Sequence, residues 1–293
     1  MIAAWWALLA ATAAIAVGDF CNRRVIGWLP DDPPRPGRKQ HLRPMPLAGV
    51  LVLPAIVPWC VADEAWLPLA AMLLAAAIGF VDDRRKERAP TVDDDGGPAD
   101  GGLDWKVKAI GLLVAAGLVA ANAHDPLASP GWFAAALAFV FVLTNAVNFL
   151  DNTDGVAAGL SATMLLCFAL GVGGAPPWIT AAGCAALAFV PWNWPTPRLF
   201  LGDGGAYVLG LAAGLASVGQ WRQQPDVVWI VALPLVDFVQ VVCARLWLGH
   251  PPWVGDRRHV THILQNVGVP RRAVAPIVCA AALLLALLFG PAR

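Results

Sequence analysis

The segment Asn145-Ala-Val-Asn-Phe-Leu-Asp-Asn-Thr-Asp-Gly155 separates two long apolar stretches of the chain. Two amides, Asn145 and Asn148, and two carboxylates, Asp151 and Asp154, lie where one apolar helix is expected to end and the next to begin. Polar side chains at membrane depth are costly and mark candidate functional sites. The segment therefore predicts both a helix break and a site.

The composition around this segment indicates a membrane protein. Of the 293 residues, 58% are hydrophobic and 14% are charged, whereas soluble domains carry about 25% charged residues. The formal net charge is zero, so we expect no nucleic acid partner. The six Cys are scattered without a Cys-x-x-Cys spacing, which indicates neither a disulfide framework nor a zinc site. Because the N-terminus is apolar and lacks a basic region, it predicts a retained membrane helix rather than a cleaved signal peptide.

Ten apolar runs approach the length of about 20 residues that a helix needs to cross a bilayer. The runs cover 2–18, 47–62, 65–81, 109–123, 131–150, 155–172, 177–194, 205–219, 227–243 and 273–290. We therefore predict an all-α integral membrane protein with about ten transmembrane helices, forming a single polytopic membrane domain over residues 1–293.

The basic residues lie on one side of this predicted topology. The odd-numbered connections are about 19–46, 82–108, 151–155, 195–204 and 244–272. They contain 18 of the 20 Lys and Arg residues, which leaves only Arg222 and Arg293. Basic connections stay in the cytoplasm, so we expect both termini outside and the site on the cytoplasmic face. Within 82–108, the Gly-, Pro- and Asp-rich part 89–104 predicts a mobile loop.

Most of the polar residues that could carry chemistry fall in these cytoplasmic connections. They include Asp82, Asp83, Lys106, Lys108, Asp203, Asp256, Arg257, His259 and His262. Carboxylates from several connections can hold Mg²⁺ beside phosphate oxygens, and Lys, Arg and His can bind a diphosphate. A site at the membrane surface can take one soluble and one lipid substrate. Together these features favour Mg²⁺-assisted phosphoryl transfer from a soluble donor to a lipid phosphate.

A transporter or flippase is the alternative from a different class. It predicts polar residues at mid-membrane on several helices and often an internal repeat. No repeat is visible, and only Asp237 lies clearly within an apolar run. A buried carboxylate needs a partner, for which Arg245 is a candidate. That pair is as consistent with a structural role as with catalysis.

The chain resembles the polyprenyl-phosphate N-acetylhexosamine-1-phosphate transferase family through an ordered set of motifs. The matching segments are His41-Leu-Arg-Pro-Met-Pro-Leu-Ala-Gly49, Gly79-Phe-Val-Asp-Asp83, Asn145–Gly155, Phe200-Leu-Gly-Asp-Gly-Gly205, Pro234-Leu-Val-Asp237, Arg245 and Asp256-Arg-Arg-His-Val-Thr-His262. Members of this membrane family transfer a sugar 1-phosphate from a UDP-sugar to a polyprenyl phosphate, use Mg²⁺ and release UMP. The last motif resembles the GlcNAc-1-phosphate branch, whereas the phospho-MurNAc-pentapeptide transferase branch carries three consecutive His.

The resemblance implies roles for the matching residues. The implied catalytic residues are Asp82, Asp83, Asp151 and His259, with Asp82 or Asp83 deprotonating or positioning the lipid phosphate. The implied substrate-binding residues are Lys106, Lys108, Asn145, Asn148, Asp154, Phe200, Arg257 and His262. The implied ligands for Mg²⁺, or alternatively Mn²⁺, are Asp203 and Asp151. Direct attack by the lipid phosphate and a covalent enzyme intermediate both stay open.

The resemblance also implies the cellular setting. It implies a multi-pass protein of the inner (cytoplasmic) membrane, a polyprenyl (undecaprenyl) phosphate acceptor, a UDP-GlcNAc-type donor, a role at the start of a cell-envelope glycan, and a homodimer. The chain departs from the family pattern at Thr261 (usually His), Asn152 (usually Gly), Ala206 (usually Ser) and Leu47-Ala48 (usually Arg/x-Gly). These departures leave the identity of the sugar open. Five Asp residues of the motifs are kept, which favours an active enzyme: Asp82, Asp83, Asp151, Asp154 and Asp203.

Overall fold

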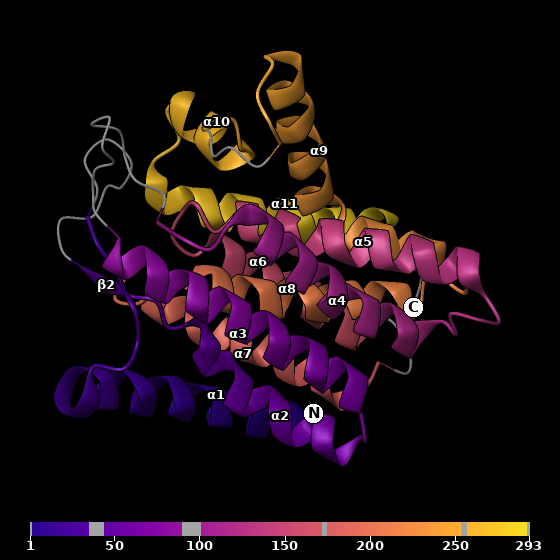
Figure 1. Ribbon diagram of the computed structural model, residues 1–293, viewed down its shortest axis with the longest axis horizontal. Helices are drawn as coiled ribbons and strands as arrows, with labels where there is room; N and C mark the ends of the chain where they lie inside the picture. Colours follow the sequence, from indigo (N-terminus) through magenta and orange to yellow (C-terminus); the bar gives the residue numbers. More distant parts are fainter. Residues whose placement is uncertain (1, 35–43, 90–100, 172–174, 253–256, 292–293) are drawn as a thin grey trace.

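The computed structural model describes residues 2–34, 44–89, 101–171, 175–252 and 257–291, and these are almost entirely helical (Figure 1). The α-helices are α1 (Ile2–Cys21), α2 (Leu53–Ala62), α3 (Trp66–Arg88), α4 (Trp105–Ala123), α5 (Pro130–Phe149), α6 (Val156–Gly171), α7 (Pro177–Asn193), α8 (Gly202–Val218), α9 (Ala232–Trp247), α10 (Val260–Asn266) and α11 (Arg271–Phe289). Shorter helical turns are η1 (Asn22–Ile26), η2 (Gly49–Val52) and η3 (Pro225–Ile230), and two-residue strands β1 (Asp31–Asp32) and β2 (Met45–Pro46) pair antiparallel.

The structure confirms an all-α membrane protein, because a helix occupies each of the ten predicted apolar runs. Five helical segments are long and apolar enough to cross a membrane: Ala4–Ile26, Trp66–Arg88, Trp105–Ala123, Pro130–Phe149 and Arg271–Phe289. The helices at the other five runs have 10 to 17 residues. A count of ten spans therefore stays a prediction.

Helix α8 is the centre of the bundle. Every residue from Gly204 to Val218 is buried, and α3 and α5 make the most extensive contacts with it. The sequence of α8 is rich in Gly and Ala, and small side chains let neighbouring helices approach closely in a membrane protein. The axes of most helices are roughly aligned in Figure 1, whereas α9 stands across them beside α10.

Two boundaries differ from the sequence prediction. Helix α3 continues to Arg88, so Asp82 and Asp83 lie inside a helix and not in a loop; that the cytoplasmic connection begins at residue 82 stays a prediction. An ion pair from Lys86 to Asp82, four residues earlier, and the basic residues of the last turn stabilise this extension.

The predicted last connection, 244–272, is also more ordered than expected. It contains the last turn of α9, the whole of α10 and the first residues of α11. The predictions for residues 41–43, for Asp256 and for most of the 89–104 loop lie outside the described residues.

Candidate active site

The candidate site forms where four helix ends meet. The C-terminal ends of α3 and α5 lie beside the N-terminal ends of α4 and α8, because these neighbouring helices alternate in direction. Residues far apart in sequence are thereby placed at one end of the bundle.

A close approach of two glycines sets the distance between α3 and α8. A Cβ atom built on Gly79 would lie 2.3 Å from the backbone nitrogen of Gly204, so no larger residue fits without moving a helix. Asp82 and Asp83 follow Gly79 by one turn, and Asp203 directly precedes Gly204. The glycine contact therefore brings the three carboxylates together.

We call Asp82, Asp83 and Asp203 the carboxylate cluster. Each offers an oxygen within 4.8 Å of the others, and among the described residues this is the one group of three or more His, Cys, Asp or Glu residues that could hold a metal ion. Asp82 is fully buried, Asp83 is 4% exposed, and the side chain of Asp203 is 14% exposed. Three buried carboxylates repel one another unless cations lie beside them.

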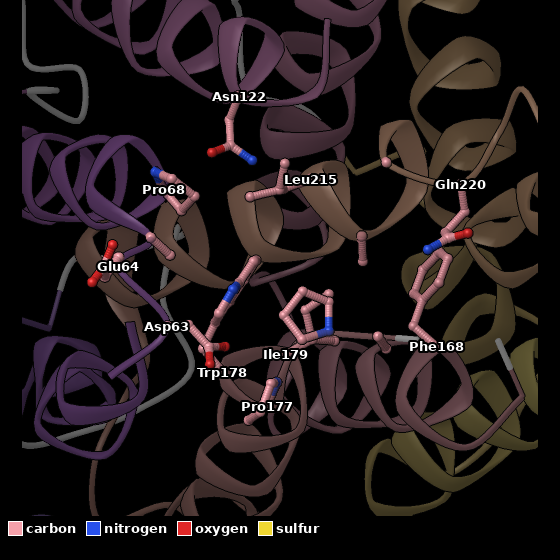
Figure 2. A pocket seen from close by; sticks show the side chains of 15 residues that line it. Asp63, Glu64, Pro68, Asn122, Phe168, Pro177, Trp178, Ile179, Leu215 and Gln220 are labelled. Atoms are coloured by element: carbon pink, nitrogen blue, oxygen red, sulfur yellow. The ribbon is translucent and has the colours of Figure 1, made fainter. Parts of the chain in front are cut away.

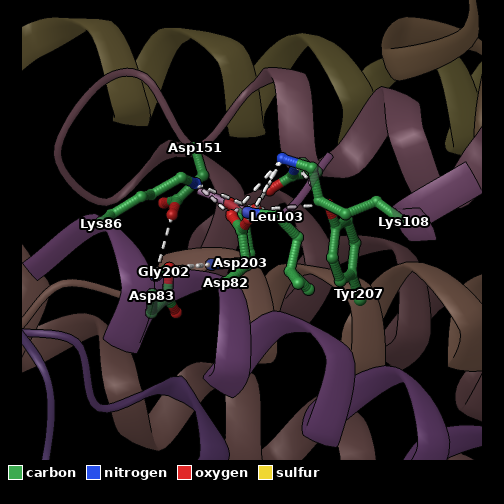
Figure 3. Close-up of polar contacts among 10 residues, drawn as sticks. Asp82, Asp83, Lys86, Leu103, Lys108, Asp151, Gly202, Asp203 and Tyr207 are labelled. Atoms are coloured by element: carbon green, nitrogen blue, oxygen red, sulfur yellow. Dashed lines mark hydrogen bonds and ion pairs between the residues drawn. The ribbon is translucent and has the colours of Figure 1, made fainter. Parts of the chain in front are cut away.

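Two lysines supply that positive charge. Lys86 Nζ lies 2.6 Å from Asp82 and 3.1 Å from Asp203, and Lys108 Nζ lies 3.4 Å from Asp82 and 4.0 Å from Asp203 (Figure 3). Lys106 instead lies over the ring of Trp105, at 5.8 Å. Of the two lysines predicted from the sequence, the structure brings Lys108 to the carboxylates. Lys86 was missed, although its position four residues after Asp82 was a usable signal.

Tyr207 connects the cluster to α5. Its hydroxyl donates to Asp203 Oδ2 over 3.3 Å and accepts a 3.5 Å hydrogen bond from the Asn148 side chain. The Asn145 side chain donates instead to the carbonyl of Phe141, one turn back in its own helix. Asn148 is thus linked to the site through Tyr207, a residue that the sequence analysis missed although it lies four positions after Asp203.

The connection between α5 and α6 contacts two sides of the site. Asp151 Oδ2 accepts a 3.0 Å hydrogen bond from the amide of Gly202, whose φ of +66° requires glycine. Asp154 forms a bidentate pair with Arg271, with both distances 2.9 Å. Asp151 lies outside the carboxylate cluster, so its role as a metal ligand stays a prediction.

The segment before Asp203 is held by the N-terminal motif. Phe200 forms two backbone hydrogen bonds with this motif. Its amide donates to the carbonyl of Pro46 over 2.9 Å, and its carbonyl accepts from the amide of Ala48 over 2.8 Å. The amide of Gly49 also donates to the carbonyl of Leu201. The described part of this motif therefore positions the turn that carries Asp203.

A buried pair joins α9 to the start of α10. His259 Nδ1 lies 2.8 Å from Asp237 Oδ2, and the amide of Val260 donates to Asp237 Oδ1 over 2.6 Å. Asp237 is 3% exposed and His259 is 4% exposed. The sequence analysis named Arg245 as a candidate partner of Asp237. In the structure the carboxylate of Asp237 contacts His259, and the guanidinium of Arg245 lies over the ring of Phe149 at 4.8 Å.

The remaining predicted residues lie near this pair. The rings of His259 and His262 are 6.0 Å apart, and Arg257 precedes them on the surface. The hydroxyl of Thr261 donates to Asn152 Oδ1 over 2.6 Å. Two of the departures from the family pattern, Thr261 and Asn152, are therefore in direct contact.

A cavity of about 560 Å³ lies at the opposite ends of α3, α4 and α8 (Figure 2). Its polar lining consists of Asp63, Glu64, Asn122 and Gln220. No lysine, arginine or histidine is among its lining residues. It is separate from the carboxylate cluster, which lies at the other end of the same helices.

Comparisons with known proteins find similarity over most of the chain. The model of glycosyl transferase family 4 matches residues 65–220, which include all three members of the carboxylate cluster. The undecaprenyl-phosphate alpha-N-acetylglucosaminyl 1-phosphate transferase of Escherichia coli strain K12 is 29% identical over 275 residues, which cover 85% of this chain and 73% of that protein. The decaprenyl-phosphate N-acetylglucosaminephosphotransferase of Mycobacterium leprae is 26% identical over an alignment of 332 positions, which covers 93% of this chain and 80% of that protein.

Proposed function

The chain belongs to glycosyl transferase family 4, and from this premise we propose that it transfers an N-acetylhexosamine 1-phosphate from a UDP-sugar to a polyprenyl phosphate. The bond between the bridging oxygen and the sugar-bearing phosphorus of the donor breaks, and UMP leaves with the electron pair. A new bond joins that phosphorus to an oxygen of the lipid phosphate. The names of the relatives support the acceptor and the aminosugar.

The observation that carries the proposal is the carboxylate cluster with its two lysines. Mg²⁺ takes oxygen ligands at about 2.0–2.1 Å, so ligands on opposite sides of the ion lie about 4 Å apart. The cluster oxygens lie within 4.8 Å of one another, which small side-chain rotations could close. The donor set therefore fits Mg²⁺, which one or two carboxylates usually hold; Asp203 and Asp82 would hold it here and leave Asp83 for the lipid phosphate. When bound, the ion would supply positive charge to the diphosphate oxygens.

The lysines and Asp83 have separate roles in the proposed reaction. Lys86 and Lys108 place two ammonium groups beside the cluster, where they can bind phosphate oxygens and the charge that develops on UMP. Asp82 already accepts hydrogen bonds from the Leu103 amide and Lys108. Asp83 has a single weak bond of 3.5 Å, from the Asp203 amide, among the described residues. Asp83 is therefore the better candidate to take a proton from, or to orient, the lipid phosphate.

The same geometry bears on the membrane topology. We propose that this end of the bundle faces the cytoplasm, where a nucleotide sugar is available, and that the protein lies in the inner membrane. The one-sided distribution of basic residues supports this orientation. Ten spans and a homodimer are part of the proposal and rest on the sequence pattern and the family resemblance.

Two competing functions are less well supported. A transporter needs polar groups along the bundle interior, whereas the described carboxylate cluster lies near the C-terminal end of α3 and the N-terminal end of α8. The peptidoglycan branch of the family is a poorer match, because the similar relatives are named for N-acetylglucosamine transfer.

The test is release of UMP by the purified protein with undecaprenyl phosphate, Mg²⁺ and a panel of UDP-sugars. We expect lipid-dependent release with one N-acetylhexosamine donor. Asp203→Ala should lower turnover by at least about 100- to 1,000-fold, because it removes a ligand of the Mg²⁺ whose charge would stabilise the diphosphate.

The matched control is Asp226→Ala, which removes an exposed carboxylate at the start of η3. This variant should keep full activity. Wild-type protein that is folded and releases no UMP with any donor would refute the proposed reaction, and full activity of Asp203→Ala would refute the assignment of the cluster.

A further inference from the structure

We propose that Asp237 is a positioning residue that fixes the ring of His259 for the reaction. This inference rests on the proposed function, because it assigns His259 to the phosphate chemistry of that site. It concerns a residue on α9 that lies outside the carboxylate cluster and outside the part of the chain matched by the family model.

The geometry leaves the ring little freedom. Asp237 Oδ2 binds His259 Nδ1 at 2.8 Å, and Asp237 Oδ1 accepts from the amide of Val260 at 2.6 Å. One carboxylate therefore holds both the side chain of His259 and the backbone that follows it. The ring of Phe149 packs edge-on against His259, with centroids 5.7 Å apart, and fixes the imidazole from a further side.

This arrangement also determines which ring nitrogen is left for a substrate. A carboxylate only accepts hydrogen bonds, so Nδ1 must carry the proton that faces Asp237. Nε2 is the remaining nitrogen, and it has no hydrogen-bond partner among the described residues. A histidine held in this way can present Nε2 to a phosphate group. A neutral ring accepts from a protonated phosphate oxygen, and a protonated ring donates to an ionised one.

The pair is connected to the rest of the site through the connection between α5 and α6. Asn152 Oδ1 accepts a hydrogen bond from the hydroxyl of Thr261, which lies two residues after His259. The side-chain amide of Asn152 donates to the carbonyl of Phe149. The neighbouring Asp151 binds the amide of Gly202 beside the carboxylate cluster. The start of α10 is thus anchored on the same short connection that contacts the cluster.

Energetic considerations favour a functional role over a purely structural one. Burial of a carboxylate and an imidazole costs free energy that apolar residues of similar size would not cost. The neighbouring residues Phe149 and Phe238 already stack on each other, with ring centroids 5.2 Å apart. Apolar packing at this junction is therefore available without the polar pair.

The experiment is a double-mutant cycle on UMP release with Asp237→Asn, His259→Ala and the double variant. Asparagine keeps the shape of the Asp237 side chain. It places an NH₂ donor opposite His259 Nδ1, however, and this favours the tautomer of His259 that carries its proton on Nε2. We expect Asp237→Asn to lower kcat by about 10- to 100-fold, the range found for residues that orient a functional ligand, with KM for the UDP-sugar changed by less than about twofold. In the His259→Ala background the same change should have no further effect on kcat.

The controls separate this inference from the proposed function. Gln240→Ala changes an exposed residue one turn further along α9, and it should keep wild-type turnover. Melting temperatures and the amount of folded protein are measured for every variant. If wild type and Gln240→Ala are active while Asp237→Asn retains its specific activity, or lowers kcat equally in both backgrounds, Asp237 acts only in folding and the inference is overturned. No activity in wild type would instead refute the proposed function.

Discussion

The two ends of the helix bundle carry similar kinds of residue but connect them differently. At one end, Asp82 and Asp203 are bridged by Lys86, which comes from the same helix as Asp82 and reaches across to α8. At the other end, Asp63 and Glu64 line a cavity, are exposed, and make no side-chain hydrogen bond or ion pair with the described residues. Acidic residues at a helix end are therefore not enough to identify a site.

The difference has a physical cause. At the site end, glycine contacts let α3 and α8 approach closely, so carboxylates are forced together in a buried environment. Such an arrangement is unfavourable unless cations compensate it. At the cavity end, each carboxylate is solvated separately, so nothing requires a partner. Substitutions at matched positions of the two ends can test this contrast.

The largest expected effect comes from removing the bridging cation. Lys86→Met leaves Asp82 and Asp203 close together with only Lys108 nearby, and breaking a buried pair in this way costs about 3 kcal/mol of folding free energy. Arg222→Met at the other end removes a cation that lies over the ring of Trp132 at 5.2 Å, which should cost about 0.5–1 kcal/mol. Melting curves in a metal-free detergent buffer rank the two variants.

Added Mg²⁺ sharpens this comparison. It should raise the melting temperature of Lys86→Met more than that of Arg222→Met, since only the first variant leaves uncompensated carboxylates. Equal losses of stability at the two ends, or equal responses to Mg²⁺, would contradict the picture of a coupled carboxylate cluster.

A smaller effect, on activity, is expected from a single methyl group between helices. Gly79→Ala places a Cβ atom 2.3 Å from the backbone of Gly204 and must push α3 away from α8. A displacement of about 1 Å at a reacting centre can cost about 100-fold in rate. Gly117→Ala is the control, because its Cβ would meet Leu137 at an ordinary 3.8 Å. UMP release by Gly117→Ala should stay near that of wild type; a Gly79→Ala enzyme of normal activity would show that the glycine contact does not set the site.

The smallest effect concerns pH at the cavity end. The pKa of His124 is lowered, first by burial and then by the charge of Arg222, and its Nε2 accepts a 3.0 Å hydrogen bond from Trp221. The folded state therefore prefers neutral His124. Its contribution to stability is complete above the unfolded pKa near 6.5 and is lost as the pH falls below that value.

The measurement is the melting temperature at about pH 7.5 and about pH 5.5 for wild type and His124→Phe. Phenylalanine keeps an aromatic ring against Trp221 but cannot titrate. The variant should lose less stability on acidification than wild type does. An identical loss in both proteins would mean that His124 does not contribute to the pH dependence.

Much of the fold was predictable because hydropathy is a local property. Each of the ten apolar runs became a helix, and the break at residues 150–155 lies between α5 and α6 as the Asn/Asp segment predicted. The extension of α3 to Arg88 was missed, because a charged helical turn has no apolar signal. The helix α10 was missed for the same reason, since it is only seven residues long and lies in a polar connection.

The sequence alone also determined which residue types gather at one end of the molecule. The spacing of motifs and the one-sided distribution of Lys and Arg identified Asp82, Asp83, Lys108 and Asp203 as members of one site, and the structure brings these four together. The sequence pattern could identify these residues because consecutive membrane helices alternate in direction, which places every second connection on the same side of the membrane.

Only the tertiary structure decided which partner each residue has. It selected Lys108 over Lys106, added Lys86 and Tyr207 to the cluster, and paired Asp237 with His259. Such contacts depend on the separation and rotation of packed helices to within about 1 Å, and the glycines that set this separation act on residues more than 100 positions away. A helical pattern fixes which face a residue occupies along its own helix, whereas a hydrogen bond between helices requires their packing.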